Sequence, residues 1–169
     1  PLIEETPWLR WLLLTKRPEN VMDMVPGSWR EMFPANVWMG STVEDQERAD
    51  WRIPHLLRIP AVVRFLSMEP LLGPVDLLTS AFNGSGSFSA MEGIRWVITG
   101  GESGHGARPS HPDWFRDLRD QCGQAGVPFH FKQWGDWLPD DHAHILPDEV
   151  HAKILSGKGP PPAGVYSDL

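Results

Sequence analysis

The stretch Trp96-Val97-Ile98-Thr99-Gly100-Gly101-Glu102-Ser103-Gly104 indicates the fold, because a short apolar run ends abruptly in glycine, polar and charged residues. The same change occurs four more times. These places are Trp11–Leu14 before Thr15–Glu19, Val37–Met39 before Gly40–Glu44, Val62–Leu66 before Ser67–Pro70, and Pro128–Phe131 before Lys132–Gly135. In α/β proteins, ligands bind at the carboxyl ends of parallel strands. The five polar strand ends therefore predict one face of one site.

The segments between the runs predict helices at about 19–25, 44–57 and 112–124, with Pro54 expected to kink or end the second of them. Residues 70–76 contain too much Pro and Gly for a long helix, and Asn83–Ser87 is typical of a surface loop. Strands that alternate with helices require a parallel sheet covered by helices. Because every strand end is polar, we predict a parallel β/α barrel, or a partial barrel of about five βα strands, rather than an open sheet.

The length of 169 residues fits one domain. The chain begins almost inside a predicted strand, so we interpret it as the C-terminal part of a larger domain. Residues 1–137 are predicted to form the partial barrel. Residues 138–169 are rich in Pro, His and Asp, and we expect a loosely ordered or packed C-terminal extension there.

Charge and cysteine content restrict the partners and the compartment. Lys plus Arg is 15 and Asp plus Glu is 22, which gives a net charge of −7 and disfavours, without excluding, binding to nucleic acid. The single cysteine, Cys122, allows no intrachain disulfide, which suits a cytoplasmic protein. No apolar run approaches the roughly 20 residues that cross a bilayer, so no membrane partner is expected.

The glycine loop Gly100–Gly106 is the sharpest candidate site. Glycines after a strand let the backbone approach a ligand closely, and their N–H groups can hold a carboxylate or a phosphate. Gly100, Gly101 and Ser103 are therefore candidate ligand contacts. Glu102 could bind an amine, a ribose hydroxyl or a metal. The spacing is not that of a dinucleotide-binding loop, and a plain turn after a strand is the alternative reading.

Glu69 places a second carboxylate at a neighbouring strand end. Glu69 and Glu102 could act as metal ligands or as an acid/base pair. A salt bridge from Glu69 to Arg64 or Arg17 is the alternative.

Two lysines also follow predicted strands. Lys16 and Lys132 would attract an anionic substrate, a phosphate or a cofactor carboxylate, unless they only balance the charge of the two glutamates. The candidate catalytic residues are thus Glu69, Glu102 and Lys132, and Lys16 is a candidate cofactor contact.

Other reactive side chains give weaker signals. His142, His144 and His151 form the tightest histidine cluster, but their spacing is not that of a strong zinc site. Arg108 and His111 flank the glycine loop, where either could touch a ligand. Cys122 lies on the predicted buried side of a helix and is expected to be a small core residue.

Five motifs together resemble one known family. They are TKRPE, NVWMGSTVEDQ, VRFLSMEPLLGPVDL, WVITGGESGHGARPSHPDWFRDLRDQC and GVPFHFKQWGDW, between Trp11 and Trp137. The chain is similar to a bacterial and phage "phage protein" domain of unknown function, whose members resemble radical S-adenosylmethionine enzymes. Such enzymes are β/α barrels with an N-terminal cysteine motif that binds a 4Fe-4S cluster, and this motif is absent here.

The resemblance implies that this chain retains the later barrel strands, with contacts to S-adenosylmethionine or substrate. Glu102 and its glycines would face one of the two. We therefore expect the C-terminal part of a radical S-adenosylmethionine-like protein, inactive alone, with a small-molecule or nucleotide-derived substrate. A metal-dependent hydrolase or lyase using Glu69 and Glu102, and a non-catalytic phage or mobile-element binding module, are the alternatives.

Overall fold

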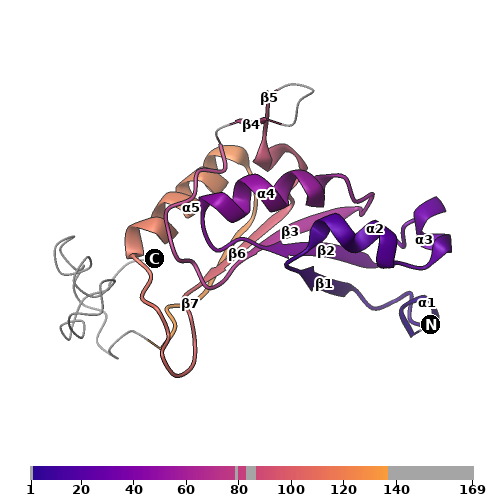
Figure 1. Cartoon of the computed structure of the whole chain (residues 1–169), viewed down its shortest axis with the longest axis horizontal. Helices are drawn as coiled ribbons and strands as arrows, with labels where there is room; N and C mark the ends of the chain where they lie inside the picture. The colour runs from indigo at the N-terminus through magenta and orange to yellow at the C-terminus, as the bar shows by residue number, and fades with distance from the viewer. Residues whose placement is uncertain (1, 79, 83–86, 137–169) are drawn as a thin grey trace.

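A five-stranded, all-parallel sheet forms the centre of the molecule (Figure 1). The computed structural model describes residues 2–78, 80–82 and 87–136. The strands are β1 (Trp11–Thr15), β2 (Val37–Thr42), β3 (Val63–Met68), β6 (Trp96–Gly100) and β7 (Phe129–Gln133). Every neighbouring pair is parallel, which confirms the predicted sheet.

The order of the strands in the sheet is the same as their order along the chain, β1-β2-β3-β6-β7. A doubly wound sheet reverses its strand order at a switch point, whereas a β/α barrel does not. Helices α2, α4 and α5 lie on the same side of the sheet, as they do around a barrel (Figure 1). The fold is therefore a parallel α/β fold consistent with a partial β/α barrel, as predicted.

The helices begin and end where the sequence predicts, within a few residues. The 3-10 helix η1 (Pro18–Asn20) leads into α2 (Val21–Met24). Helix α4 (Gln46–Leu57) is capped by Asp45, whose side chain accepts a hydrogen bond from the Arg48 N–H, and it continues through Pro54. Helix α5 (Pro112–Ala125) ends at Gly126, whose φ of 68° is a conformation that favours glycine.

The main core lies between these helices and one face of the sheet. It contains residues of β3, β6, α4 and α5 that are almost fully buried: Leu66, Met68, Val97, Ile53, Leu56, Phe115 and Leu118. Cys122 belongs to this core, as predicted. Phe65 points to the opposite face and packs over Gly40, where an added Cβ would lie 2.3 Å from its ring. Trp96 packs beside Phe65 on that face, with a distance of 6.0 Å between the ring centres.

Several elements were not predicted. The strands β2, β3, β6 and β7 extend two or three residues beyond their apolar runs, because residues such as Ser41 and Thr99 are buried inside the sheet. Helices α1 (Leu2–Glu5), α3 (Gly27–Glu31) and η2 (Ala90–Gly93), and the antiparallel hairpin β4 (Ser80–Phe82) and β5 (Ser87–Ser89), have no strong sequence signal. Most of the predicted loop Asn83–Ser87 and the extension 138–169 lie outside the described residues. Among the helices of the described residues, none has the length and apolar character needed to cross a membrane.

Candidate functional site

The predicted site residues gather at the carboxyl edge of the sheet. Lys16, Glu44, Glu69 and Glu102 directly follow, or come within two residues of, the ends of β1, β2, β3 and β6, and Lys132 is the penultimate residue of β7. Since the strands are parallel and adjacent, these residues lie along one edge. Their side chains form three charged clusters.

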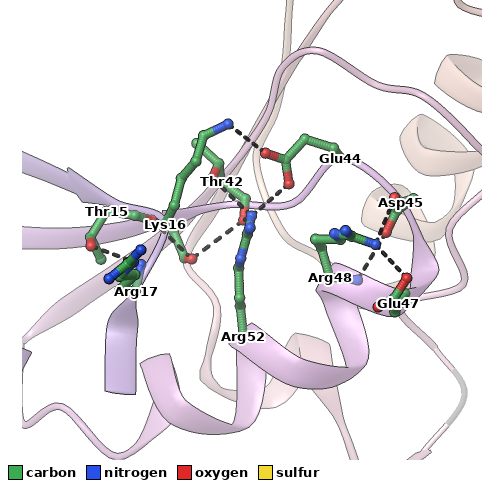
Figure 2. Close-up of polar contacts among 10 residues, drawn as sticks. Thr15, Lys16, Arg17, Thr42, Glu44, Asp45, Glu47, Arg48 and Arg52 are labelled. Carbon is green, nitrogen blue, oxygen red and sulfur yellow. Dashed lines mark hydrogen bonds and ion pairs between the residues drawn. The ribbon is translucent and has the colours of Figure 1, made fainter. Parts of the chain in front are cut away.

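The first cluster is centred on Glu44, which is nearly buried (Figure 2). Lys16 Nζ lies 2.8 Å from its Oε1, and Arg52 Nη1 from α4 lies 2.5 Å from its Oε2. Arg52 also donates to the carbonyl oxygen and hydroxyl of Thr42, at 3.0 and 3.1 Å. Burial alone would raise the pKa of Glu44, but the hydrogen bond from Lys16 and the charge of Arg52 outweigh it and lower that pKa. Glu44 is therefore an ionised, fully paired anchor between β1, β2 and α4.

The second cluster is centred on Glu69, which follows β3. Its Oε1 accepts hydrogen bonds from Lys132 Nζ at 3.0 Å and from Gln133 Nε2 at 3.1 Å, both on β7. Its Oε2 accepts no hydrogen bond from a protein group within the described part of the chain. The carboxylate lies over Gly100 of β6, where an added Cβ would come within 3.1 Å of Cδ and Oε2. Gly100 thus makes room for Glu69, which keeps one oxygen available.

The third cluster joins Glu102 to Arg108. Arg108 Nη2 donates to Oε1 at 2.6 Å, and its Nε and backbone N–H donate to Oε2 at 2.8 and 2.7 Å. These bonds from Arg108 lower the pKa of Glu102 to about 2. Both carboxylate oxygens are therefore occupied, and the ion pair closes the loop between residues 102 and 108.

Two glycines hold the ends of β6 and β7 together. A Cβ at Gly101 would lie 1.6 Å from the backbone oxygen of Trp134, and one at Gly135 would lie 2.3 Å from the backbone oxygen of Glu102. The Gly104 N–H donates to Asp136 Oδ2 at 2.6 Å. The close approach that Gly101 was expected to offer a ligand is thus used by a neighbouring backbone.

The three clusters share one electrostatic environment. The charge of Lys16 contributes to the lowered pKa of Glu102, and the charge of Glu44 contributes to the raised pKa of Arg108. Gln133 connects Glu69 to the glycine loop, because its Nε2 also donates to Ser103 Oγ at 2.6 Å. The carboxyl edge therefore carries charges of both signs that lie close enough to influence one another.

Sequence reasoning missed Arg52. Of the partners that it considered for Glu69, Lys132 forms the ion pair. Arg52 lies inside a helix, and only the folded structure shows that the second turn of α4 lies beside the end of β2. Arg64 was a candidate partner of Glu69, but its Nε donates to the Ile59 carbonyl oxygen at 2.8 Å, before the start of β3. His111 caps α5 through its Nδ1, which accepts a hydrogen bond from the Asp113 N–H.

Metal and cluster ligands are scarce. Within residues 2–78, 80–82 and 87–136, no three His, Cys, Asp or Glu side chains are grouped to hold a metal ion. The histidines 142, 144 and 151 lie outside the described residues. Cys122 is the single cysteine of the chain, and burial raises the pKa of its thiol to about 12. The residues of this chain therefore do not fit a 4Fe-4S cluster.

A family model described as "Protein of unknown function (DUF5131)" matches residues 1–159. No curated protein and no solved structure matches the chain.

Proposed function

The chain belongs to the DUF5131 family, and we propose that its carboxyl edge binds a small ligand that carries both an ammonium and a carboxylate group. S-adenosylmethionine is the proposed ligand of this class. In this proposal the chain is the C-terminal, ligand-binding part of a radical S-adenosylmethionine-like barrel protein and is inactive alone. The cysteines of a cluster would come from outside these residues.

The observation that carries the proposal is the environment of Glu69. One of its oxygens is held by Lys132 and Gln133, and the other accepts no hydrogen bond from the described residues. The side chain of Glu69 is 19% exposed, so this second oxygen stays open to solvent and to a ligand. An ammonium group of a ligand could donate a charge-assisted hydrogen bond to it.

Lysines supply the opposite charge on the same edge. Lys16 and Lys132 are more than half exposed, so each can turn toward a ligand carboxylate while it stays near its glutamate. Glu102 would act through the loop that it closes with Arg108. Ser103, held by Gln133, would present its hydroxyl beside Glu69.

The metal-dependent alternative receives less support from these contacts. The carboxylates of Glu69 and Glu102 each bond to a protein cation. Two such carboxylates would first have to release Lys132 and Arg108 before they could share a metal ion.

Isothermal titration with S-adenosylmethionine tests the proposal. Glu69→Gln removes the charge but keeps the shape of the side chain. We expect the affinity for S-adenosylmethionine to fall at least 10-fold, because a charge-assisted hydrogen bond contributes about 1.5–3 kcal/mol. Glu47→Gln is the control, because Glu47 is an exposed residue of α4 outside the clusters. Its affinity should equal that of the unchanged chain.

A second ligand separates the ammonium contact from the rest of the site. 5′-Methylthioadenosine lacks both the ammonium and the carboxylate, so Glu69→Gln should leave its weaker binding unchanged. Absence of S-adenosylmethionine binding, or equal losses for the two ligands in Glu69→Gln, would disprove the proposed role of Glu69.

A further inference from the structure

Two arginines lie side by side at the amino end of the sheet, away from the site at its carboxyl edge. Phe65 of β3 pairs with Trp96 of β6. The Arg95 N–H donates to the Arg64 carbonyl oxygen at 2.8 Å, so the pairing continues one residue toward the amino end. Because adjacent strands lie about 4.8 Å apart, Arg64 and Arg95 are direct cross-strand neighbours.

The two side chains leave the sheet on the same face. Successive side chains of a strand point to opposite faces, so Arg64 shares the face of Leu66. Arg95 shares the face of Val97 for the same reason. Leu66 and Val97 belong to the core that the helices cover. The arginines therefore stand at the amino-terminal border of this core, where Arg64 is half-buried and Arg95 is exposed.

No protein carboxylate neutralises this pair within the described part of the chain. Arg64 Nε donates to the Ile59 carbonyl oxygen at 2.8 Å, which fixes the position of the guanidinium group. The Nη groups of Arg64 and the guanidinium group of Arg95 donate to no described residue. Glu92 of η2, the acidic residue nearest to Arg95 along the chain, forms no ion pair with a described residue either.

Two positive charges in this position favour an anion between them. Like charges directly opposite one another on neighbouring strands destabilise a sheet. Burial, and after it the charge of Arg95, lowers the pKa of Arg64, so the two guanidinium groups influence one another. Each guanidinium group presents a planar set of N–H donors that matches the oxygens of a phosphate group. One dianionic phosphate would neutralise both charges and accept hydrogen bonds from the unused donors.

We propose that Arg64 and Arg95 form a binding site for the phosphate group of a small phosphate monoester. Arg64, held by the Ile59 carbonyl oxygen, donates through its Nη groups, and Arg95 contacts the anion from the exposed side. A monoester carries nearly two negative charges at neutral pH, whereas a phosphodiester carries one. The net charge of −7 disfavours a long polyanion such as nucleic acid. The site is at the opposite end of β3 from Glu69, so it does not depend on the ligand site proposed above.

Titration with inorganic phosphate at pH 8, at constant ionic strength and without S-adenosylmethionine, tests the proposal by two-dimensional NMR. Phosphate should shift the backbone amides and the Nε–H signals of Arg64 and Arg95. Arg95→Gln should weaken phosphate binding at least 10-fold, because it removes one of the two charged partners. Arg10→Gln is the matched control, since Arg10 is an exposed arginine that precedes β1 at the same end of the sheet. Its affinity for phosphate should equal that of the unchanged chain.

Two further measurements separate phosphate binding from a structural role of the pair. Dimethyl phosphate, a singly charged diester, should bind at least fivefold more weakly than inorganic phosphate. In urea titrations without phosphate, Arg95→Gln should be at least as stable as the unchanged chain, because it removes a contact between like charges. Phosphate should then stabilise the unchanged chain and Arg10→Gln more than Arg95→Gln.

Four results would each overturn the proposal. They are the absence of shifts at Arg64 and Arg95 at 50 mM phosphate, equal phosphate affinities of Arg95→Gln and Arg10→Gln, binding of dimethyl phosphate or a thymidine oligonucleotide as tight as that of phosphate, and a loss of stability in phosphate-free Arg95→Gln.

Discussion

At the scale of single residues, the carboxyl edge contains two kinds of charged side chain. Some are fully paired within the protein and stabilise the fold, and others are available to a ligand. Glu44 and Glu102 each use both oxygens within the protein, whereas Glu69 uses one. The sequence predicted all of these glutamates as residues of one edge. The sequence could not distinguish the roles of these glutamates, because only the folded chain brings Arg52 and Arg108 into contact with Glu44 and Glu102.

Arg52→Gln should destabilise the protein strongly, because it leaves the nearly buried Glu44 with one cationic partner. We expect a loss of about 2–4 kcal/mol in the free energy of unfolding, measured by urea titration. Arg48→Gln is the control on the same helix, since Arg48 pairs with exposed Glu47 and should change stability by about 0.5 kcal/mol or less (Figure 2). Equal losses for the two variants would show that the ion pairs of Glu44 contribute no more to stability than an exposed ion pair does.

The Glu102–Arg108 pair should make stability depend on pH in a defined window. The pKa of Glu102 is lowered from 4.5 to about 2, so its contribution is complete above about pH 4.5 and is lost as the pH falls toward 2. The difference in unfolding free energy between the unchanged chain and Glu102→Gln should be about 1 kcal/mol at pH 6 and should shrink toward zero near pH 2. Urea titrations across this range measure it, and a constant difference would contradict the ion pair.

At the scale of elements, the apolar runs predict the strands, and the segments between them predict α4 and α5 to within a few residues. The runs end too early, because Ser41 and Thr99 are polar residues that lie buried within strands. The hairpin β4–β5 is missed because its residues surround a Gly/Ser-rich stretch that is typical of a loop. The lengths of strands and the presence of hairpins depend on how segments pair with one another. The apolar pattern of a single segment carries no information about that pairing.

Gly101→Ala should separate the ends of β6 and β7, because the new Cβ would lie 1.6 Å from the Trp134 backbone oxygen. We expect a loss of about 3 kcal/mol or more in the free energy of unfolding. Gly123→Ala is the matched control in α5, where an added Cβ meets nothing within 4 Å, and it should stabilise by about 0.5–1 kcal/mol. Thermal melts compare the two. A Gly101→Ala variant as stable as the unchanged chain would contradict this close approach of the two backbones.

At the scale of the whole molecule, parallel strands in chain order collect every carboxyl end on one edge. The repeated change from apolar run to polar cluster predicts this arrangement, because adjacent parallel strands leave no other place for the polar ends. The position of α2, α4 and α5 on one side of the sheet follows from the order of the strands that pair (Figure 1). A reading of individual motifs does not provide that information.

The most direct test of the central claim maps S-adenosylmethionine onto the sheet by amide chemical shifts in two-dimensional NMR. The ligand should shift amides at 15–17, 43–45, 100–104 and 132–136, together with Glu69, because these segments form the carboxyl edge. Shifts gathered instead at the amino ends of the strands, near 36–37, 61–63, 94–96 and 127–129, or no shifts at all, would contradict a ligand site at the carboxyl edge.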